Sequence, residues 1–134
     1  FVTLFLTFSF LLAGLFCHAQ PDDKQLVQYG NFPGYGVRSA GIEEILANTR
    51  MKCLEKKCKV VSFDIYGTNP GKEYIGPYRS DADTMNDAQK RYVRSLVHNS
   101  KLWICNIVLR YKDGTERVIG KGDTEYSIYF FTIK

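Results

Sequence analysis

Cys105 and His98 are the residues of this sequence whose types could carry out covalent catalysis. A thiolate nucleophile needs a base within hydrogen-bond reach and a further group that orients the base, so a small secreted thiol hydrolase is one hypothesis. However, strand alternation predicts Cys105 on the same apolar face as Trp103, Ile107 and Leu109. Apolar burial makes a thiol inert. We therefore expect Cys105 to be a core or disulfide residue, and His98 to follow a helix whose negative end it faces.

Cys53 and Cys58 are close enough in sequence to pair locally if the intervening "LEKK" forms a turn. A structural zinc site would need about four ligands, usually as two close pairs, and the sequence does not supply them. We expect a Cys53–Cys58 disulfide, although a bond from either residue to Cys105 stays open because sequence alone does not settle connectivity.

Other chemical motifs are missing from the sequence. Asp81, Asp83 and Asp87 do not have the spacing of an EF-hand loop, and Asp83 is better explained as a helix cap. There is no phosphate-binding loop, no G-x-S-x-G and no H-E-x-x-H. The sequence therefore predicts no catalytic residue, no bound metal and no cofactor, and we expect a protein that is not an enzyme.

Residues 1–19 carry no charged side chain. They consist of an apolar run that is followed by the small and polar residues Cys17-His18-Ala19. Small residues one and three places before a cut suit signal peptidase, so we expect a signal peptide that is removed after Ala19. The basic region that normally opens such a signal is missing. An uncleaved anchor is the alternative, but the run is short for a span of about 20 residues. We expect a periplasmic or secreted protein with no membrane span after cleavage.

The composition is that of an ordinary globular domain. Of 134 residues, 45% are hydrophobic and 24% are charged, and the net charge is +4. The basic residues are spread out, and the densest group, "RMKCLEKKCK", is best explained as a solvated face. Nucleic acid is not an expected partner, because no basic patch with interleaved aromatic residues is present.

The order of predicted elements favours an α+β domain with a mostly antiparallel sheet or sandwich and one main helix that crosses over between strands. Residues 20–40 are rich in turn formers and predict a flexible lead-in, and 41–134 predict a single domain. Residues 42–54 fit a helix or a short strand. Residues 59–67 alternate as a strand with Val61, Phe63 and Ile65 on its apolar face, and a helix capped by Asp83 or Thr84 runs toward residue 98. "KDGT" predicts a hairpin, and "EYSIYFFTIK" predicts a last strand with both faces covered.

The loop between the strand and the helix carries residue types that are common at protein interfaces. Tyr74, Tyr78 and Arg79 lie among turn formers, with "EYI" as a brief edge strand. A secreted binding or inhibitor domain that uses this loop is a further hypothesis.

Four motifs, in order, resemble the C-terminal domain of GldM, the periplasmic protein of gliding motility and type IX secretion. The family has a strand ending in V-S-F, a helix, a strand of the L-Y-I-E-N-I type, a Gly-Pro-Asp-Gly turn and a closing F-x-I. The matching stretches within 41–134 are Val61-Ser62-Phe63, Leu102-Trp103-Ile104-Cys105-Asn106-Ile107, Lys112-Asp113-Gly114-Thr115 and Phe131-Thr132-Ile133. The chain departs from the family at 48–51, in an apparent insertion that bears Cys53 and Cys58, and at Cys105, which replaces a commonly polar residue.

The resemblance implies an exported interaction or assembly module without catalysis of its own. Its partners would be proteins of the cell envelope, or a second copy of the chain in a homodimer. GldM itself is a long membrane-anchored motor component, so a chain with a signal and one domain would be a stand-alone relative.

Overall fold

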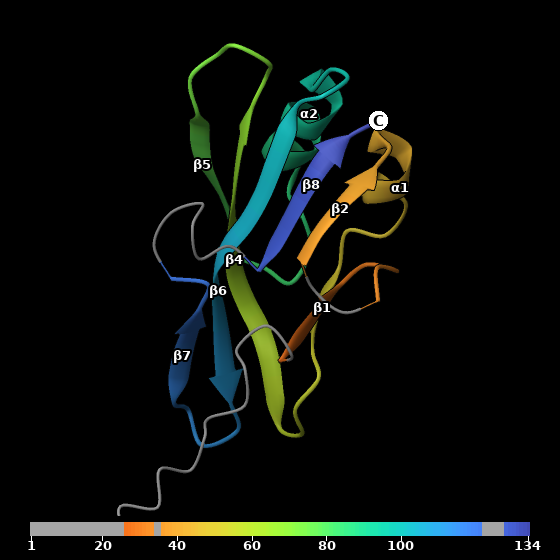
Figure 1. The fold of residues 1–134 in the computed structure, drawn as a ribbon. Helices are drawn as coiled ribbons and strands as arrows, with labels where there is room; N and C mark the ends of the chain where they lie inside the picture. The colour runs from red at the N-terminus through yellow and green to blue at the C-terminus, as the bar shows by residue number, and fades with distance from the viewer. Residues whose placement is uncertain (1–25, 34–35, 122–127) are drawn as a thin grey trace, which may run out of the picture.

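A six-stranded mixed sheet forms the centre of the computed structural model, which describes residues 26–33, 36–121 and 128–134 (Figure 1). All paired strands are antiparallel except β2 and β8, which are parallel. The strand order is β2 (Gly36–Ala40), β8 (Tyr129–Ile133), β6 (Lys101–Tyr111), β4 (Cys58–Thr68) and β5 (Ile75–Ser80), with β7 (Glu116–Ile119) paired to the second half of β6.

Two helices and a second strand pair complete the fold. The helices are α1 (Ile42–Ala47) and α2 (Asp87–Ser95), and the pair is β1 (Val27–Tyr29) with β3 (Met51–Cys53). Helix α2 crosses over between β5 and β6. The prediction of an α+β domain with a mostly antiparallel sheet and one main helix is confirmed.

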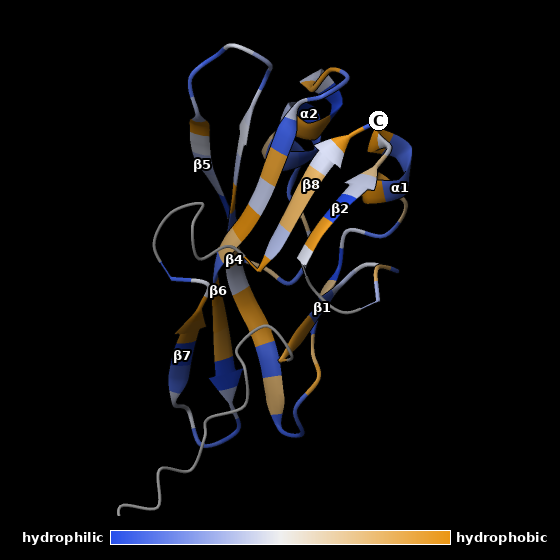
Figure 2. Ribbon diagram, in the orientation of Figure 1, coloured by the Kyte–Doolittle hydropathy of each residue, from blue (hydrophilic) through white to orange (hydrophobic). Residues whose placement is uncertain are grey.

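One face of the sheet carries the core. Both helices lie at the same end of the sheet in Figure 1, and β1 lies toward the other end. Their apolar side chains and those of the strands form one buried cluster, which includes Tyr29, Ile45, Phe63, Val93, Leu102, Ile104, Ile107, Leu109, Tyr129 and Phe131. Figure 2 shows hydrophobic and hydrophilic residues interleaved along the strands, as expected for a sheet that buries one face.

Helix α2 begins later than the sequence predicts. Its N-cap is Asn86, whose side chain accepts a hydrogen bond from the Gln89 amide at 2.9 Å, while the Gln89 side chain accepts one from the Asn86 amide at 3.2 Å. The predicted cap at Asp83 or Thr84 is wrong, because Asp83 accepts a backbone bond from Met51 through its carbonyl. The helix ends at Ser95, before His98.

A bulge at Asn106 reverses which side chains of β6 face the core. Asn106 has a φ of 50°, so an extra residue enters β6 between the pairs Asp64–Cys105 and Ser62–Val108. Leu102 and Ile104 precede the bulge and Ile107 and Leu109 follow it, yet all four belong to the core. Cys105 is buried as expected, but the prediction that it shares a face with Ile107 and Leu109 is wrong.

Strand β4 carries the compensating irregularity. Val61 is the extra residue between the pairs Ser62–Val108 and Val60–Leu109, so the register of β4 and β6 is the same at both ends. Val60 therefore joins the core in place of Val61, which the sequence pattern had grouped with Phe63 and Ile65. The strand ends at Thr68, one residue beyond the predicted glycine.

The predicted flexible lead-in is also wrong where the structure describes it. Within 20–40, β1 pairs with β3 and β2 pairs with β8. The next segment, which fits either a helix or a strand by sequence, forms α1. The predicted signal peptide at 1–19 lies outside the described residues. The hairpin at "KDGT" is confirmed, and the short edge strand predicted at "EYI" begins at Ile75 and extends to Ser80.

Candidate interaction face

The face of the sheet opposite α1 and α2 carries an aromatic row. We call this face the open face, because the core to which α1, α2 and β1 contribute lies on the other face, although Asp64, Trp103 and Cys105 of the open face are also buried. Strand register places four side chains side by side across β2, β8, β6 and β4, and they are Val37, Phe130, Trp103 and Tyr66. Since directly opposed side chains on one face are in contact range, the row is continuous.

Tyr74 extends this row from the loop before β5. Its ring centroid lies 5.0 Å from that of Trp103, and Trp103 also stacks on Phe130 at 5.1 Å. Trp103 is only 8% exposed, whereas Tyr74 and Val37 are 62% and 75% exposed. Lys101 places its ammonium 5.6 Å from the centre of the Phe130 ring and donates to Thr132 Oγ1 at 2.9 Å. The row is therefore a packed aromatic surface with a polar border.

The three residues predicted as a partner surface divide between the two faces. Tyr74 joins the aromatic row. Tyr78 packs inward and stacks on Tyr92 at 4.7 Å, so it supports the core. Arg79 is exposed, donates to Ser62 Oγ at 3.1 Å and pairs with Asp81 at 3.4 Å. Sequence reasoning missed Val37, Tyr66, Trp103 and Phe130 as surface candidates, because only strand register shows that they adjoin.

Asp64 and Cys105 pair across β4 and β6, two residues along each strand from Tyr66 and Trp103 of the aromatic row. Both are buried, and Asn106 Nδ2 donates to Asp64 Oδ2 at 3.0 Å. Cys105 lies outside the disulfide. His98 is exposed beyond the end of α2, and no hydrogen bond joins it to Cys105 in the part of the chain that the structure describes. The structure does not bring the nucleophile and base of the thiol-hydrolase hypothesis together.

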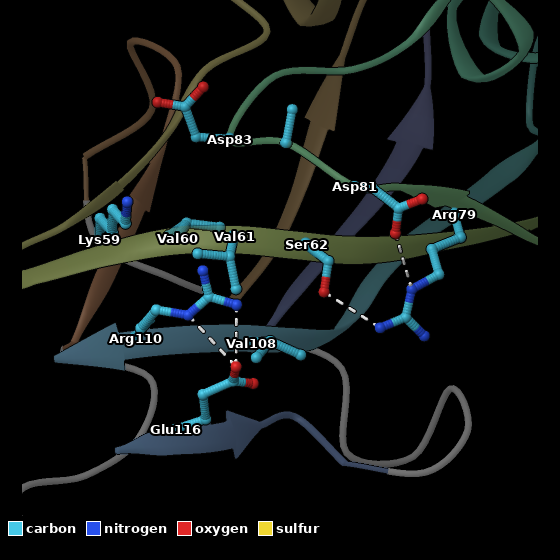
Figure 3. Close-up of a pocket in the computed structure, with 11 residues that line it drawn as sticks. Lys59, Val60, Val61, Ser62, Arg79, Asp81, Asp83, Val108, Arg110 and Glu116 are labelled. Carbon is cyan, nitrogen blue, oxygen red and sulfur yellow. Dashed lines mark hydrogen bonds and ion pairs between the residues drawn. The ribbon is translucent and has the colours of Figure 1, made fainter. Parts of the chain in front are cut away.

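A charged groove of about 640 Å³ occupies the other end of the open face (Figure 3). Val61, Ser62 and Val108 form its apolar and neutral lining. Charged side chains surround them, and these are Lys59, Arg79, Asp81, Asp83, Arg110 and Glu116. Figure 3 shows Arg110 bonded to Glu116, and the shortest of these contacts is 2.9 Å.

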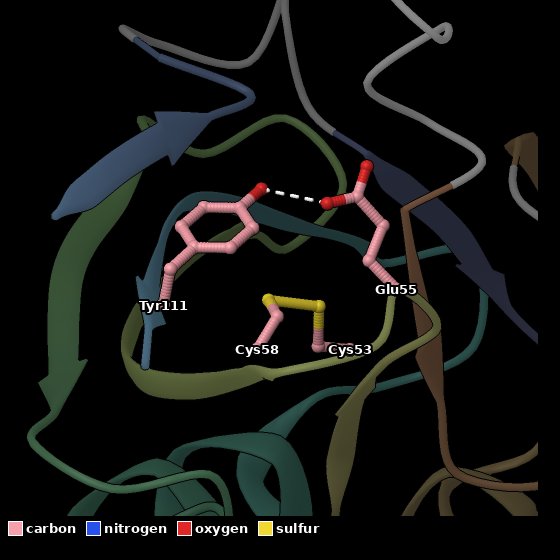
Figure 4. Close-up of a disulfide and its surroundings, with 4 residues drawn as sticks. All are labelled: Cys53, Glu55, Cys58 and Tyr111. Atoms are coloured by element: carbon pink, nitrogen blue, oxygen red, sulfur yellow. Dashed lines mark hydrogen bonds between the residues drawn. A yellow bond between two sulfur atoms is a disulfide. The ribbon is translucent and has the colours of Figure 1, made fainter. Parts of the chain in front are cut away.

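The expected local disulfide is present between Cys53 and Cys58 (Figure 4). It joins the end of β3 to the start of β4 and packs against the core. Beside it, the Tyr111 hydroxyl donates to Glu55 Oε2 at 2.9 Å. Desolvation and this carboxylate raise the pKa of Tyr111, while Arg117 opposes them. The disulfide thus closes the loop between β3 and β4, and the Tyr111–Glu55 hydrogen bond joins that loop to the end of β6.

Among residues 26–33, 36–121 and 128–134, no group of three or more His, Cys, Asp or Glu side chains is placed to hold a metal ion. No helix in those ranges is long and apolar enough to span a bilayer.

No protein-family model matches this chain, and no curated protein is significantly similar to it.

Proposed function

We propose that this protein is an exported, non-catalytic interaction module that docks on a protein partner through the aromatic row of the open face. The carrying observation is the contiguous set of Val37, Phe130, Trp103 and Tyr74 on the open face, with Val37 and Tyr74 strongly exposed. Tryptophan and tyrosine are the residues most enriched among interface hot spots.

The packing of the row favours binding over a purely structural role. Tyr74 and Phe130 flank Trp103 on two sides, so the indole is held before any partner arrives. A preorganised side chain loses little conformational entropy on binding, which leaves more of the contact energy as affinity. The exposed Val37 and Tyr74 offer apolar area that docking would remove from water.

The Cys53–Cys58 disulfide and the resemblance to the GldM C-terminal domain support the cellular setting of the proposal. Disulfides persist in oxidising compartments such as the periplasm and the extracellular space. The partner that we propose is a protein of the cell envelope, as in gliding motility and type IX secretion, rather than a nucleic acid.

The test is recovery of the partner from native envelopes by cross-linking, with variants of the exposed row. Tyr74→Ala and Val37→Ser should weaken binding by about tenfold or more each, because hot-spot truncations cost about 2 kcal/mol. Leu54→Ser is the matched control, since Leu54 is 55% exposed outside the row. Equal recovery with all three variants would contradict the proposal. Gel filtration of the wild type tests whether the partner is a second copy.

A further inference from the structure

The hairpin end of β4 and β6 places like charges opposite each other. Lys59 pairs directly with Arg110, and the next contact is a backbone bond of 3.0 Å from the Lys112 amide to the Lys57 carbonyl. Like charges directly opposite across strands are destabilising. A like-charge pair that lowers stability suggests that the positive charge has a use beyond folding.

The acidic side chains of this region are already engaged. Three of them form ion pairs, which are Asp81 with Arg79, Asp83 with Arg50, and Glu116 with Arg110. Glu55 accepts from Tyr111, and Asp113 accepts from the amide and hydroxyl of Thr115. Lys57, Lys59 and Lys112 are exposed and have no ion pair with any described residue. We call these three the lysine cluster.

The lysine cluster lines a hollow that continues the groove of Figure 3. The hollow has a volume of about 460 Å³, and Lys59 and Arg110 line both it and the groove. Together the two concavities follow β4 from Ser62 to Lys57, which is roughly 17 Å at about 3.3 Å per residue. β5 pairs only with residues from Phe63 to Gly67, so this part of β4 has a described strand partner, β6, on one side only.

We propose that this composite groove binds an extended acidic peptide segment of a partner protein. The carboxylates of the segment pair with the lysine cluster, and its apolar side chains contact Val61 and Val108 on the groove lining. The backbone of the segment can run along the side of β4 that β5 leaves open, as in strand addition to a sheet edge. The Cys53–Cys58 bond fixes the start of β4 and so positions Lys57 and Lys59.

The lining favours a peptide over another polyanion. Nucleic acid binding uses aromatic platforms interleaved with basic residues, and Tyr111 is the one aromatic residue among those lining either concavity. The groove also mixes apolar and charged side chains, which suits a chain of alternating acidic and apolar residues. This inference does not depend on the aromatic row, because the two sets share no residue.

Fluorescence anisotropy with a labelled, extended peptide of alternating Glu and Val tests the proposal. The Lys57→Ala/Lys59→Ala/Lys112→Ala variant should bind about 3- to 100-fold more weakly, since each of the three exposed ion pairs contributes about 1.5- to 5-fold. The matched control is Lys72→Ala/Arg91→Ala/Arg94→Ala, which removes three exposed basic residues elsewhere and should bind like the wild type. Thermal unfolding confirms that both variants are folded.

Further probes distinguish binding of an acidic peptide from non-specific binding of a polyanion. A peptide with Gln in place of Glu should not bind, and salt should weaken binding of the Glu peptide because exposed charges are screened. Equal loss in the control variant, or equal affinity for an oligonucleotide or dextran sulfate, would overturn the proposal. Tyr74→Ala should leave peptide binding unchanged, so failure here and failure of the docking function of the aromatic row are distinguishable.

Discussion

The two ends of the open face lie on the same two strands, β4 and β6, and carry different chemistry. At the end beside α2, the helix end, Tyr66 and Trp103 contribute to the aromatic row. At the hairpin end, Lys59 and Arg110 occupy the same face. Between them, Val61 and Asn106 are the extra residues of two compensating bulges. The paired bulges reverse the side-chain alternation of both strands while keeping their register, so one ladder can expose apolar residues at one end and charges at the other.

Substitution of Asn106 should have the largest effect on the difference between the two ends. Asn106→Val should destabilise the fold by about 3 kcal/mol, because a β-branched residue is strained at a φ of 50° and buried Asp64 loses its hydrogen bond. Asn106→Gly avoids the backbone strain but still removes the hydrogen bond to Asp64, and it should cost about 1 kcal/mol. Urea unfolding measures both. Equal destabilisation by the two variants would show that backbone strain is not the main cause of the stability lost in Asn106→Val.

Removal of the disulfide should affect the hairpin end alone. Loop-closure entropy predicts a loss of about 2 kcal/mol for Cys53→Ser/Cys58→Ser, with weaker binding of acidic peptides. The chain has a single tryptophan, so the emission of Trp103 reports on the helix end and should not shift. Amide exchange should accelerate around Lys57 and Lys112. A large change in Trp103 emission would mean that the two ends are coupled.

The cap of α2 gives a smaller effect at the helix end. Asn86→Ala should cost about 1 kcal/mol, because the amide of Gln89 loses the side-chain oxygen that it bonds to. Thr84→Ala is the control, since the cap lies at Asn86 and no side-chain hydrogen bond of Thr84 is found among the described residues. Thermal unfolding followed by circular dichroism measures both variants. Equal losses would place the effective cap at Thr84.

Tyr92 provides the smallest effect near neutral pH. Its hydroxyl is buried with no hydrogen-bond partner among the described residues, so Tyr92→Phe should change stability little or raise it slightly. Burial, with a smaller effect from Tyr78, raises the pKa of Tyr92 from 10.0 to about 12.

The raised pKa of Tyr92 predicts how the wild type and Tyr92→Phe differ with pH. Because folding raises this pKa, the stability that depends on the protonated Tyr92 hydroxyl is fully present below pH 10 and is lost as the pH rises through about 12. Urea midpoints should therefore be similar for the wild type and Tyr92→Phe at neutral pH, and the wild type should lose more stability in strong alkali. Parallel pH profiles would contradict the assignment of this loss to Tyr92.

Local chemistry made much of the fold predictable. Asp113-Gly114 tolerates the backbone angles of a tight hairpin, and the predicted hairpin is present. Burial of Cys105 followed from its apolar neighbours in a strand. The Cys53–Cys58 bond followed from spacing, and the aromatic residues on both faces of the last strand fit its place between β2 and β6.

The errors share a physical cause, which is contact between residues distant in sequence. β1 and β2 lie in a stretch rich in turn formers that looked like a lead-in, but they gain strand hydrogen bonds from β3 and β8. Asp83 is a good capping residue by type, yet its backbone is held by Met51, so Asn86 caps α2 instead. A period-two pattern also cannot reveal a bulge, because the extra residue is set by the partner strand.

The sequence by itself determined the class of the fold, the hairpin turn and the buried cysteine, and it favoured the local disulfide, because each depends on neighbouring residues and on side-chain type. Only the tertiary structure decided which side chains share the open face. Val37, Phe130 and Trp103 are far apart along the chain and become neighbours through strand register. The lysine cluster likewise forms because β4 and β6 pair along their length, which brings Lys112 next to Lys57.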